Sequence, residues 1–573
     1  MADTDSAVDV LIVGAGISGI GMAAHLRAKC PARSFAIVER RAGLGGTWDL
    51  FRYPGIRSDS DMHTLGFDFE PWRHEKSIAD APAILDYLDR IVDERGIRPH
   101  IRFGHKVLAA DFDSARARWE VTVETSEGER KCLAASWLYL GSGYYDYDEP
   151  FDPGFDLGGF AGQVVHPQFW PEDMDYAGKN VVVIGSGATA VTIVPAMAEK
   201  AGHVTMLQRT PTWMFSRPAK DALANFLRRW LPEELAYRIT RWKNIKLQDI
   251  GFKRAREKPE KVRQFLHKKI RKIMGEDYDL APFTPPYNPW DQRLCLVPDD
   301  DLFAAIKAGT AEVVTARIAG FEADGVWLED GALIPADIVV TATGLKLAVA
   351  GKIAVSVDGA AVDFAKHFYY KGCMFSNVPN LAVVFGYLNA SWTLRADINA
   401  DYVCRVLNAM EASGAAVAVL SYPMWQTRYG GAIDVIGKTE QIGPLAEMSR
   451  EAVPISGVCA VFAESEVINH LSQGTSPADI MQGAIVSLVD RSVQLMKRVQ
   501  MQPQFTLTGG ILRFASMGRL LRERLGAEVN IPPPDDVQYV AALGAAVLGQ
   551  RRLKVREEQR LADAAAGSVR VGS

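Results

Sequence analysis

The stretch that decides the fold is VDVLIVGAGISGIGMAAHLR, residues 8–27. An apolar, β-branched run ends at a glycine, and a helical pattern follows directly. Gly14, Gly16 and Gly19 form G-x-G-x-x-G at this junction. The first glycine permits a tight turn, the second lets main-chain amides approach a pyrophosphate, and the third lets the helix pack closely on the strand. Residues 8–27 therefore predict a Rossmann-like dinucleotide-binding unit.

An acid follows at the expected distance. The segment SFAIVERR, residues 34–41, predicts a second strand that ends at Glu39. A carboxylate there can accept hydrogen bonds from ribose hydroxyls. A glycine-rich turn without function is the alternative, which the strand, helix and acid together disfavour. We expect FAD at this site, with Glu39 and Arg40 beside it.

The pattern recurs in KNVVVIGSGATAVTIVPAMA, residues 179–198, with Gly185, Gly187 and Ala190 at the motif positions. The strand predicted next has Gln208, Arg209 and Thr210 where the first unit has its acid. A guanidinium in place of a carboxylate suits a ribose that bears a 2′-phosphate. This site therefore predicts NADPH, bound through Arg209 and Thr210. A solvated surface arginine is the alternative for Arg209.

Two further segments, SWLYLGSGYY (136–145) and PADIVVTATGL (335–345), each run a strand into a turn of small residues. Such turns often lie where a chain crosses between nucleotide domains, although many strands end in glycine. Thr343 and Gly344 are expected at the cofactors on this basis.

The bulk composition sets wider limits. The chain has 573 residues, which exceeds one hydrophobic core and predicts three or four domains. A net charge of −5 gives no general argument for nucleic acid or membrane binding. Six cysteines without metal-type pairs suit a reducing cytosol. The acidic start lacks the basic region of a signal peptide, and no apolar run reaches about 18 residues. We expect a cytoplasmic protein without a metal.

Two longer motifs are more specific. GGTWDLFRYPGIRSD (45–59) and FAGQVVHPQFWPE (160–172), which carries F-x-G-x-x-x-H-x-x-x-W-P, resemble the fingerprints of type I Baeyer–Villiger monooxygenases, within the flavin-containing monooxygenases. Three stretches look most like the ethionamide-activating monooxygenases of mycobacteria: residues 49–67, 287–298 and 389–408. The resemblance covers about residues 8–410.

The resemblance implies FAD, NADPH and O2 as the reactants that bind beside a small-molecule substrate. It implies insertion of one oxygen atom into ketones, or its transfer to sulfur in thioethers and thioamides, through a C4a-(hydro)peroxyflavin. Such an adduct decays in water, so the site must be dry and covered. An NADPH oxidase or a disulfide reductase is an alternative, but no redox cysteine pair lies near either nucleotide motif.

The resemblance also assigns residues. Asp59 matches the family's acid beside the flavin, where it would orient an arginine; Arg217 is the candidate for that arginine and Arg293 the reserve. Asp59 as a helix N-cap and Arg217 as a surface charge are the alternatives. His166 would set the placement of the two domains, or would simply be a hydrogen-bonded linker histidine. Further cofactor contacts are expected at Gly46, Thr47, Trp48, Asp59, Val107 and Asn389. A core tryptophan is the alternative for Trp48.

Residues 221–272 are helical in pattern and strongly basic. The resemblance places there a helical insertion that shapes the substrate pocket. A basic amphipathic surface could also contact anionic lipid, which leaves peripheral membrane association open. A solvated helix face with pairs such as Glu257 with Lys261 is the plainer interpretation.

After about residue 412 the sequence changes character. Residues 436–474 and 505–549 resemble the C-terminal lobe of BadF/BadG/BcrA/BcrD-type activator ATPases, which have an actin-like fold. Gly509 and Gly510 stand where that fold holds adenosine, and Cys459 stands at a cluster-ligand position. The lobe with the acidic phosphate-binding loop is missing, as is the cysteine upstream of Cys459 that would be its partner ligand. The C-terminal lobe alone is therefore not expected to hydrolyse ATP or hold a cluster. An ATP-binding activator or interaction module with an accessory flavin domain is the alternative function.

The predicted fold is α/β: two Rossmann-like dinucleotide-binding domains with a helical insertion, and a C-terminal half-lobe. The expected divisions are 1–150 (FAD domain, first part), 151–345 (NADPH domain, insertion at about 219–290), 346–412 (FAD domain, closing part), 413–430 (junction), 431–552 (ATPase-like lobe, a candidate protein-binding part) and 553–573 (tail).

Overall fold

The structure, a computed structural model, describes residues 7–292, 294–387, 390–420, 442–455, 470, 474–498, 505–506, 515–527 and 529–531. The chain divides into two compact units, Met1–Ser421 and Tyr422–Ser573. Five residues singled out from the sequence lie outside the described residues: Arg293, Asn389, Cys459, Gly509 and Gly510. Their roles stay predictions.

The first domain is built on a nine-stranded sheet. The run before Gly14 forms β1 (Val8–Val13), which pairs in parallel with β2 (Phe35–Val38) and β6 (Arg130–Leu140). The sheet order is β18-β17-β4-β5-β6-β1-β2-β3, with β21 beside β6. Its other strands are β3 (Ile101–Arg102), β4 (His105–Asp113), β5 (Arg118–Thr125), β17 (Ala354–Val357), β18 (Ala360–Ala361) and β21 (Leu381–Val383). The sheet thus contains strands from both ends of the first unit.

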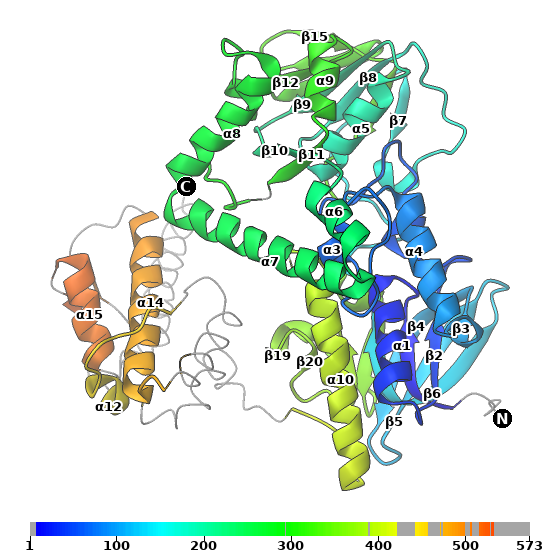
Figure 1. Ribbon diagram of the computed structural model, residues 1–573, viewed down its shortest axis with the longest axis vertical. Coiled ribbons are helices and arrows are strands. Elements are labelled where there is room, and N and C mark those ends of the chain that lie inside the picture. The colour runs from blue at the N-terminus through cyan, green and yellow to red at the C-terminus, as the bar shows by residue number, and fades with distance from the viewer. Residues whose placement is uncertain are drawn as a thin grey trace, which may run out of the picture. The chain divides into compact units, whose positions relative to one another are not determined.

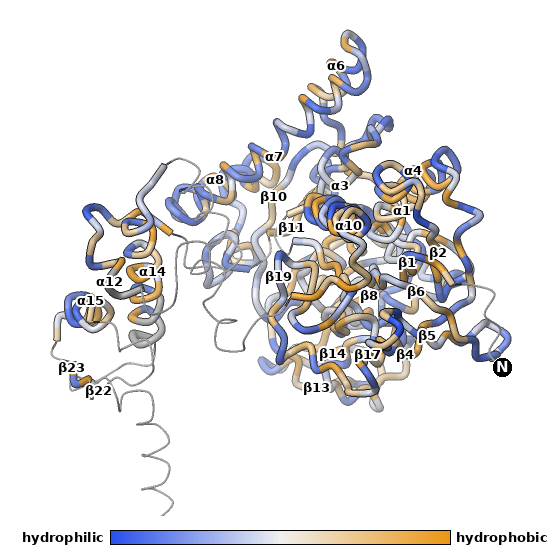
Figure 2. Tube along the Cα trace, turned by 90° about the horizontal axis from the view of Figure 1, so that it is seen from below, coloured by the Kyte–Doolittle hydropathy of each residue, from blue (hydrophilic) through white to orange (hydrophobic). Residues whose placement is uncertain are grey.

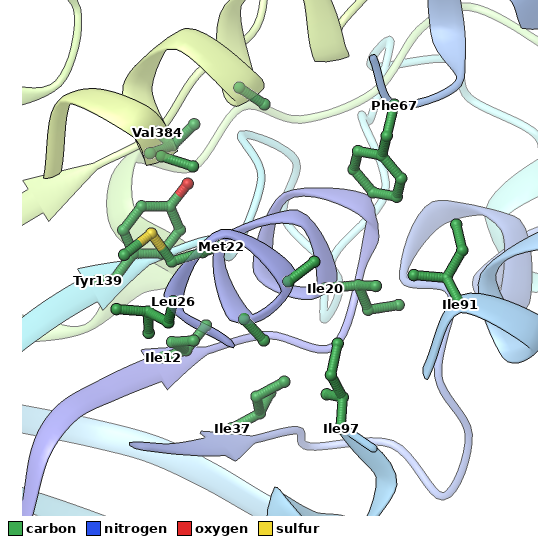
Figure 3. Packing of buried hydrophobic residues seen from close by; sticks show 14 of the residues in the cluster. Ile12, Ile20, Met22, Leu26, Ile37, Phe67, Ile91, Ile97, Tyr139 and Val384 are labelled. Carbon is green, nitrogen blue, oxygen red and sulfur yellow. The ribbon is translucent and has the colours of Figure 1, made fainter. Parts of the chain in front are cut away.

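Helices cover this sheet and close its core. Helix α1 (Ile17–Lys29) follows the glycine turn and packs against α10 (Thr393–Ser413), while α4 (Ala81–Glu94) lies beside it. Figure 3 shows the apolar side chains that meet around α1. The labelled ones are Ile12, Ile20, Met22, Leu26, Ile37, Phe67, Ile91, Ile97, Tyr139 and Val384. This packing holds the N-terminus of α1 in a fixed place.

The second domain has a five-stranded parallel sheet in the order β12-β9-β8-β16-β7. Its strands are β7 (Gln163–Val165), β8 (Asn180–Ile184), β9 (His203–Gln208), β12 (Ala311–Thr315) and β16 (Ile338–Thr341). Helices α5 (Ala188–Ala198) and α9 (Asp301–Lys307) pack on it. Small sheets complete the unit: β10 (Met214–Arg217) with β11 (Cys295–Pro298), β13 (Ile318–Glu322) with β14 (Gly325–Leu328) and β15 (Leu333–Pro335), and β19 (Tyr369–Tyr370) with β20 (Met374–Phe375). The predicted pair of Rossmann-like domains is confirmed.

The basic segment forms three helices, α6 (Ala222–Trp230), α7 (Glu233–Glu257) and α8 (Pro259–Met274). Figure 1 shows α7 as a long green helix, one end of which lies against the short α3 (Met62–Leu65) of the flavin domain. The predicted pair of Glu257 with Lys261 is wrong, because α7 ends at Glu257 and Pro259 begins α8. Proline has no amide hydrogen and fits the first turn of a helix rather than its interior.

In the second unit the described elements are α12 (Ile442–Glu447), α14 (Pro477–Arg498), α15 (Ala515–Leu525), and the parallel strands β22 (Phe505–Thr506) and β23 (Val529–Asn530). The three helices of this unit share a small apolar core, which includes Ala446, Met481, Ile485, Val489 and Leu521. This unit is therefore packed around side chains distinct from those of the first unit.

Candidate functional site

The first glycine turn has room only for glycine at two of its positions. Gly14 has φ +98°, and its amide donates to the Val38 carbonyl at 2.8 Å. A Cβ on Gly19 would lie 1.9 Å from the Gly14 carbonyl oxygen, far inside van der Waals contact. No side chain caps the first turn of α1, whose N-cap is Gly16. The uncapped amides and the helix dipole favour an anion there, as a dinucleotide pyrophosphate requires.

Glu39 supports this turn from the end of β2. Its buried carboxylate accepts hydrogen bonds from the Ala15 amide at 2.8 Å and the Arg41 amide at 2.9 Å. Burial raises the pKa of Glu39, while the two amides act in the opposite direction. One cavity is lined by Gly14, Glu39, Arg40 and Val107, together with Ser142 and Tyr145. Four residues predicted at FAD thus meet at a single hollow at the carboxyl ends of β1 and β2.

The segment after residue 45 closes over the same turn. The amide of Gly45 donates to the Ala15 carbonyl at 2.9 Å, and a Cβ on Gly46 would lie 3.1 Å from Gly16 Cα. Thr47 begins the short helix α2 (Thr47–Leu50) and contacts the Tyr147 hydroxyl. Trp48 is partly buried and packs against the core around α1, so the core alternative for Trp48 has structural support.

The second glycine turn repeats the first. Gly185 has φ +133°, and a Cβ there would lie 2.3 Å from the Ala342 carbonyl oxygen. A Cβ on Gly187 would meet no atom within 4 Å, so this turn faces open space. Ala190 is fully buried, and no side chain caps α5. This geometry offers a second anion site at a helix N-terminus.

The side chains at and after the end of β9 point in different directions. Gln208 is buried and donates to the Pro282 carbonyl at 2.7 Å and to Thr315 at 2.9 Å, so it faces the domain interior. Arg209 is exposed, and no carboxylate of the described residues lies within ion-pair distance of it. The Thr210 carbonyl accepts from Ser186 at 3.2 Å. Arg209 is thus available for a phosphate, and the geometry leaves the solvated-arginine alternative open.

His166 lies at the end of β7, within the second domain. It follows β7, and its Nε2 lies 3.3 Å from the Gly344 carbonyl, while the Gln168 amide donates to its Nδ1 at 3.2 Å. An acceptor at Nδ1 fixes the neutral tautomer with the proton on Nε2, and burial lowers the pKa of His166 accordingly. Beside Gly344, the buried Thr343 hydroxyl has no partner among the described residues. His166 therefore ties the segment after β7 to the turn after β16, both in the second domain, and its role in placing the two domains stays a prediction.

Asp59 and Arg217, the expected catalytic pair, form no hydrogen bond or ion pair with each other. Asp59 is exposed, and the N-cap alternative for it is wrong, because Asp61 caps α3 by accepting from the Thr64 amide. Arg217 ends β10, partly buried, without an ion pair to any described carboxylate. The nearby Arg57 pairs instead with Asp301.

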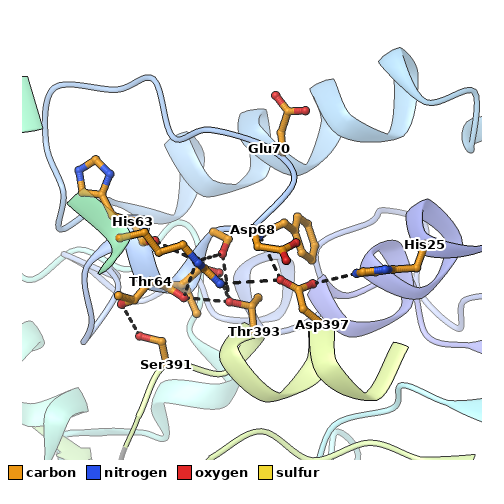
Figure 4. A network of polar contacts seen from close by, with 12 residues as sticks. His25, His63, Thr64, Asp68, Glu70, Ser391, Thr393 and Asp397 are labelled. Carbon is orange, nitrogen blue, oxygen red and sulfur yellow. Dashed lines mark hydrogen bonds and ion pairs between the residues drawn. The ribbon is translucent and has the colours of Figure 1, made fainter. Parts of the chain in front are cut away.

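A network that sequence reasoning missed surrounds α3 (Figure 4). Arg241 of α7 donates to the carbonyls of His63 at 2.9 Å, Thr64 at 3.3 Å and Gly66 at 2.8 Å. The Thr393 hydroxyl at the start of α10 lies 2.9–3.1 Å from the carbonyl oxygens of Thr64, Leu65 and Gly66, which share its single proton. The unpaired carbonyls that end a helix are thus satisfied by side chains from two distant helices.

Two further contacts strengthen this α7–α3 clasp. Tyr237 donates to the Phe67 carbonyl at 2.7 Å, and Asn244 donates to the Asp61 carboxylate at 2.8 Å. Tyr237, Arg241 and Asn244 are spaced i, i+4, i+7 and so share one face of α7. The clasp joins the insertion to the segment that carries Asp59.

A buried carboxylate, that of Asp397, continues the network toward α1. His25 Nε2 lies 3.4 Å from Asp397, which also accepts from the Asp68 amide at 3.1 Å and lies 3.9 Å from Arg241. Burial raises the pKa of Asp68, and Asp397 adds to that effect. His25, Asp68 and Asp397 therefore join α1 to α10 under the insertion.

Comparison with known proteins identifies the first unit. Residues 11–269 match the pyridine nucleotide-disulphide oxidoreductase family. This range begins within the first glycine motif segment, residues 8–27, and contains the second, residues 179–198. The chain is 51% identical over 419 residues to "FAD-containing monooxygenase EthA" of Mycobacterium tuberculosis, an alignment that covers 73% of this chain and 86% of that one. The chain belongs to the FAD-containing monooxygenases. It is also 50% identical to "Probable FAD-binding monooxygenase AlmA" of Acinetobacter baylyi over 71% of this chain and 82% of that one.

Solved structures agree with the fold of this monooxygenase. "Oxidized steroid monooxygenase bound to NADP" matches with a TM-score of 0.62 at 21% identity, over 82% of this chain and 98% of that one. "Open crystal structure of cyclohexanone monooxygenase" matches with a TM-score of 0.61 at 21% identity, over the same shares. The predicted resemblance and α/β fold class are confirmed.

The C-terminal resemblance of this monooxygenase is confirmed as well, because residues 433–549 match the BadF/BadG/BcrA/BcrD ATPase family. The relatives favour the monooxygenase over the ATP-binding activator as the function of the chain. Among the helices that the structure describes, none is long and apolar enough to cross a membrane.

Proposed function

We propose that this monooxygenase uses FAD and NADPH to transfer one oxygen atom of O2 to a ketone or to the sulfur of a thioether or thioamide. The observation that carries the proposal is the pair of uncapped helix N-termini, α1 and α5, each behind a glycine turn within one unit. A small-molecule substrate and O2 are the partners that a flavin monooxygenase needs.

The first turn fits FAD. Because Gly14 and Gly19 lie in close contact and carry no side chains, main-chain amides are the groups that would face a pyrophosphate. Glu39, whose carboxylate accepts from the Ala15 amide, stands at the ribose position. Arg40 and Val107 line the same cavity, and Gly46 to Trp48 lie on the α1 side of it. When bound, flavin would supply the electron transfer and the reaction with O2.

The second turn fits NADPH. Gly185 and Gly187 form the turn, Ala190 allows α5 to pack against the sheet, and Arg209 offers an unpaired guanidinium for a 2′-phosphate. Thr210 follows it, and the unpartnered Thr343 hydroxyl beside Gly344 is a further candidate contact.

The chain's own residues would position and shelter these groups. His166 holds the segment after β7 against Gly344 by a hydrogen bond. We propose that this segment sets the placement of the two domains. The α7–α3 clasp fixes the segment with Asp59. We propose Asp59 as the acid beside the flavin and Arg217 as its arginine, with Arg293 in reserve; a movement on cofactor binding would have to bring the first two together.

The test is an absorbance and product assay on the purified full chain. A bound yellow chromophore should bleach with NADPH without O2 and recover in air, and a ketone or thioether should yield an ester or sulfoxide. Protein that is stabilised by ATP but neither binds flavin nor oxidises NADPH would contradict the proposal.

Two finer expectations extend it. One is a peripheral membrane contact of an otherwise cytoplasmic enzyme through the basic helices. The other is a protein partner of the C-terminal lobe, which matches an ATPase family. Neither is needed for the oxygen transfer itself.

A further inference from the structure

The helical insertion exposes large apolar side chains. Eight of them lie on α6 and α7: Leu223, Phe226, Trp230, Leu235, Ile239, Trp242, Leu247 and Ile250. The two tryptophans are the most open, with Trp230 74% and Trp242 65% exposed. Single exposed apolar residues are ordinary, but a gathering of this kind marks an interaction surface.

On α7 these side chains are arranged on one face. Because a helix turns 100° per residue, Leu235, Ile239, Trp242 and Ile250 fall within a single stripe. The opposite face is the one that is buried, through Ala236, Tyr237, Thr240 and Asn244. The stripe therefore points away from the flavin domain that α7 clasps.

Helix α6 has the same division. Leu223, Phe226 and Trp230, spaced i, i+3, i+7, share one exposed face, and Ala224 is buried on another side. The Phe226 and Trp230 rings lie 6.5 Å apart. Figure 2 shows α6 projecting from the domains of the first unit, with apolar and polar residues interleaved along it. The exposed face is thus carried outward by the hairpin of α6 and α7.

The charge around these faces is predominantly positive. Arg229, Arg238, Lys246 and Arg254 are exposed, and within the described residues none of them forms an ion pair. On α7, Arg238 and Lys246 fall within or beside the apolar stripe by the same periodicity. Of the acids on α7, Asp249 pairs with Lys253 and Glu233 with Arg73. Glu234 and Glu257 are exposed and, among the described residues, have no ion pair. Four unpaired cations thus stand against two unpaired acids. The outward faces therefore present net positive charge beside tryptophan.

We propose that α6 and α7 dock in the plane of an anionic phospholipid bilayer. Tryptophan suits the boundary between acyl chains and headgroups, because its ring is apolar and its N–H is polar. Unpaired arginine and lysine attract anionic headgroups. Together these are the features of a helix that lies in the membrane interface. A protein partner would have to supply both an apolar groove and acids along two helices, whereas an anionic bilayer supplies both everywhere.

Flotation of the full-length protein with vesicles tests the proposal, and it needs no enzymatic activity. The protein should float with vesicles of phosphatidylcholine and phosphatidylglycerol, and far less with phosphatidylcholine alone. The double variant Trp230→Glu/Trp242→Glu should bind at least about tenfold more weakly. The charge variant Arg238→Glu/Lys246→Glu should lose the preference for anionic vesicles and its salt dependence.

Trp327→Glu is the matched control, because Trp327 lies on β14 and is also exposed, at 40%. It should float like the parent protein. NADPH oxidation by the variants shows that they fold, and loss of oxidation in the parent would count against the proposed function without touching the flotation result. Absent flotation of the parent, equal flotation of the tryptophan double variant, or self-association that this variant abolishes in place of vesicle binding would each overturn the proposal.

Discussion

Replacing Arg241 by methionine should loosen the insertion from the flavin domain. Methionine keeps much of the length of the side chain but has neither charge nor donors. The Arg241 side chain is 11% exposed and donates to three carbonyls, and Asp397 lies 3.9 Å from it. The Thr393 hydroxyl stays within hydrogen-bond distance of the Thr64 and Gly66 carbonyls. The His63 carbonyl would lose its hydrogen bond to Arg241, and Asp397 would lose its nearby positive charge.

The size of the effect follows from these contacts. Hydrogen bonds to a charged group contribute about 1.5–3 kcal/mol each, and breaking a buried charge pair costs about 3–5 kcal/mol. We expect a loss of about 3–5 kcal/mol. The first unit spans 421 residues, and an unfolding entropy of about 2.1 cal/mol/K per residue gives roughly 0.9 kcal/mol/K for it. The midpoint should therefore fall by about 3–6 °C.

The assay is the release of bound flavin on heating, followed by flavin fluorescence. Arg238→Met is the control on the same helix, because Arg238 is exposed, and it should leave the midpoint unchanged. Arg241→Lys keeps the charge with fewer fixed donors and should fall between parent and Arg241→Met. An unchanged midpoint in Arg241→Met, or a fall as large in Arg238→Met, would refute the reasoning.

Three further results are expected. Gly19→Val should abolish flavin binding, since its Cβ would lie 1.9 Å from the Gly14 carbonyl oxygen; flavin retained after gel filtration would contradict this. Arg209→Ala should raise KM for NADPH about tenfold or more with little change for NADH, measured by NADPH and NADH oxidation, because a phosphate contact is worth roughly 1.5–3 kcal/mol. Burial lowers the pKa of His63 to about 4, so the unfolded chain, with a histidine pKa of about 6.5, takes up the proton first. The stability is present above about pH 6.5 and is lost as the pH falls toward 4. His63→Gln should therefore lose about 2 kcal/mol less than the parent between pH 7 and pH 5 in urea unfolding; equal losses would exclude this role.

The sequence alone determined the parts of this protein that depend on neighbours along the chain. The two glycine turns, the acid after β2 and the helical, basic insertion are set within a few residues by backbone conformation, side-chain size and periodicity. Within this turn, a Cβ on Gly19 is excluded by the carbonyl oxygen of Gly14, five residues earlier, which is a local steric restriction. The family motifs likewise lie in short stretches, so the monooxygenase fold could be predicted before any coordinates were known.

Only the tertiary structure decided which distant residues meet. Nothing in the local pattern pairs Arg241 with the carbonyls of α3, since 178 residues separate it from His63. Asp61 caps α3, and its carboxylate also accepts from Asn244 of α7, 183 residues along the chain. The amphipathic pattern of α7 likewise permits either of two faces to be buried. The clasp of Tyr237, Arg241 and Asn244 turns the polar face inward, because buried carbonyls require donors, and this leaves Trp242 in solvent.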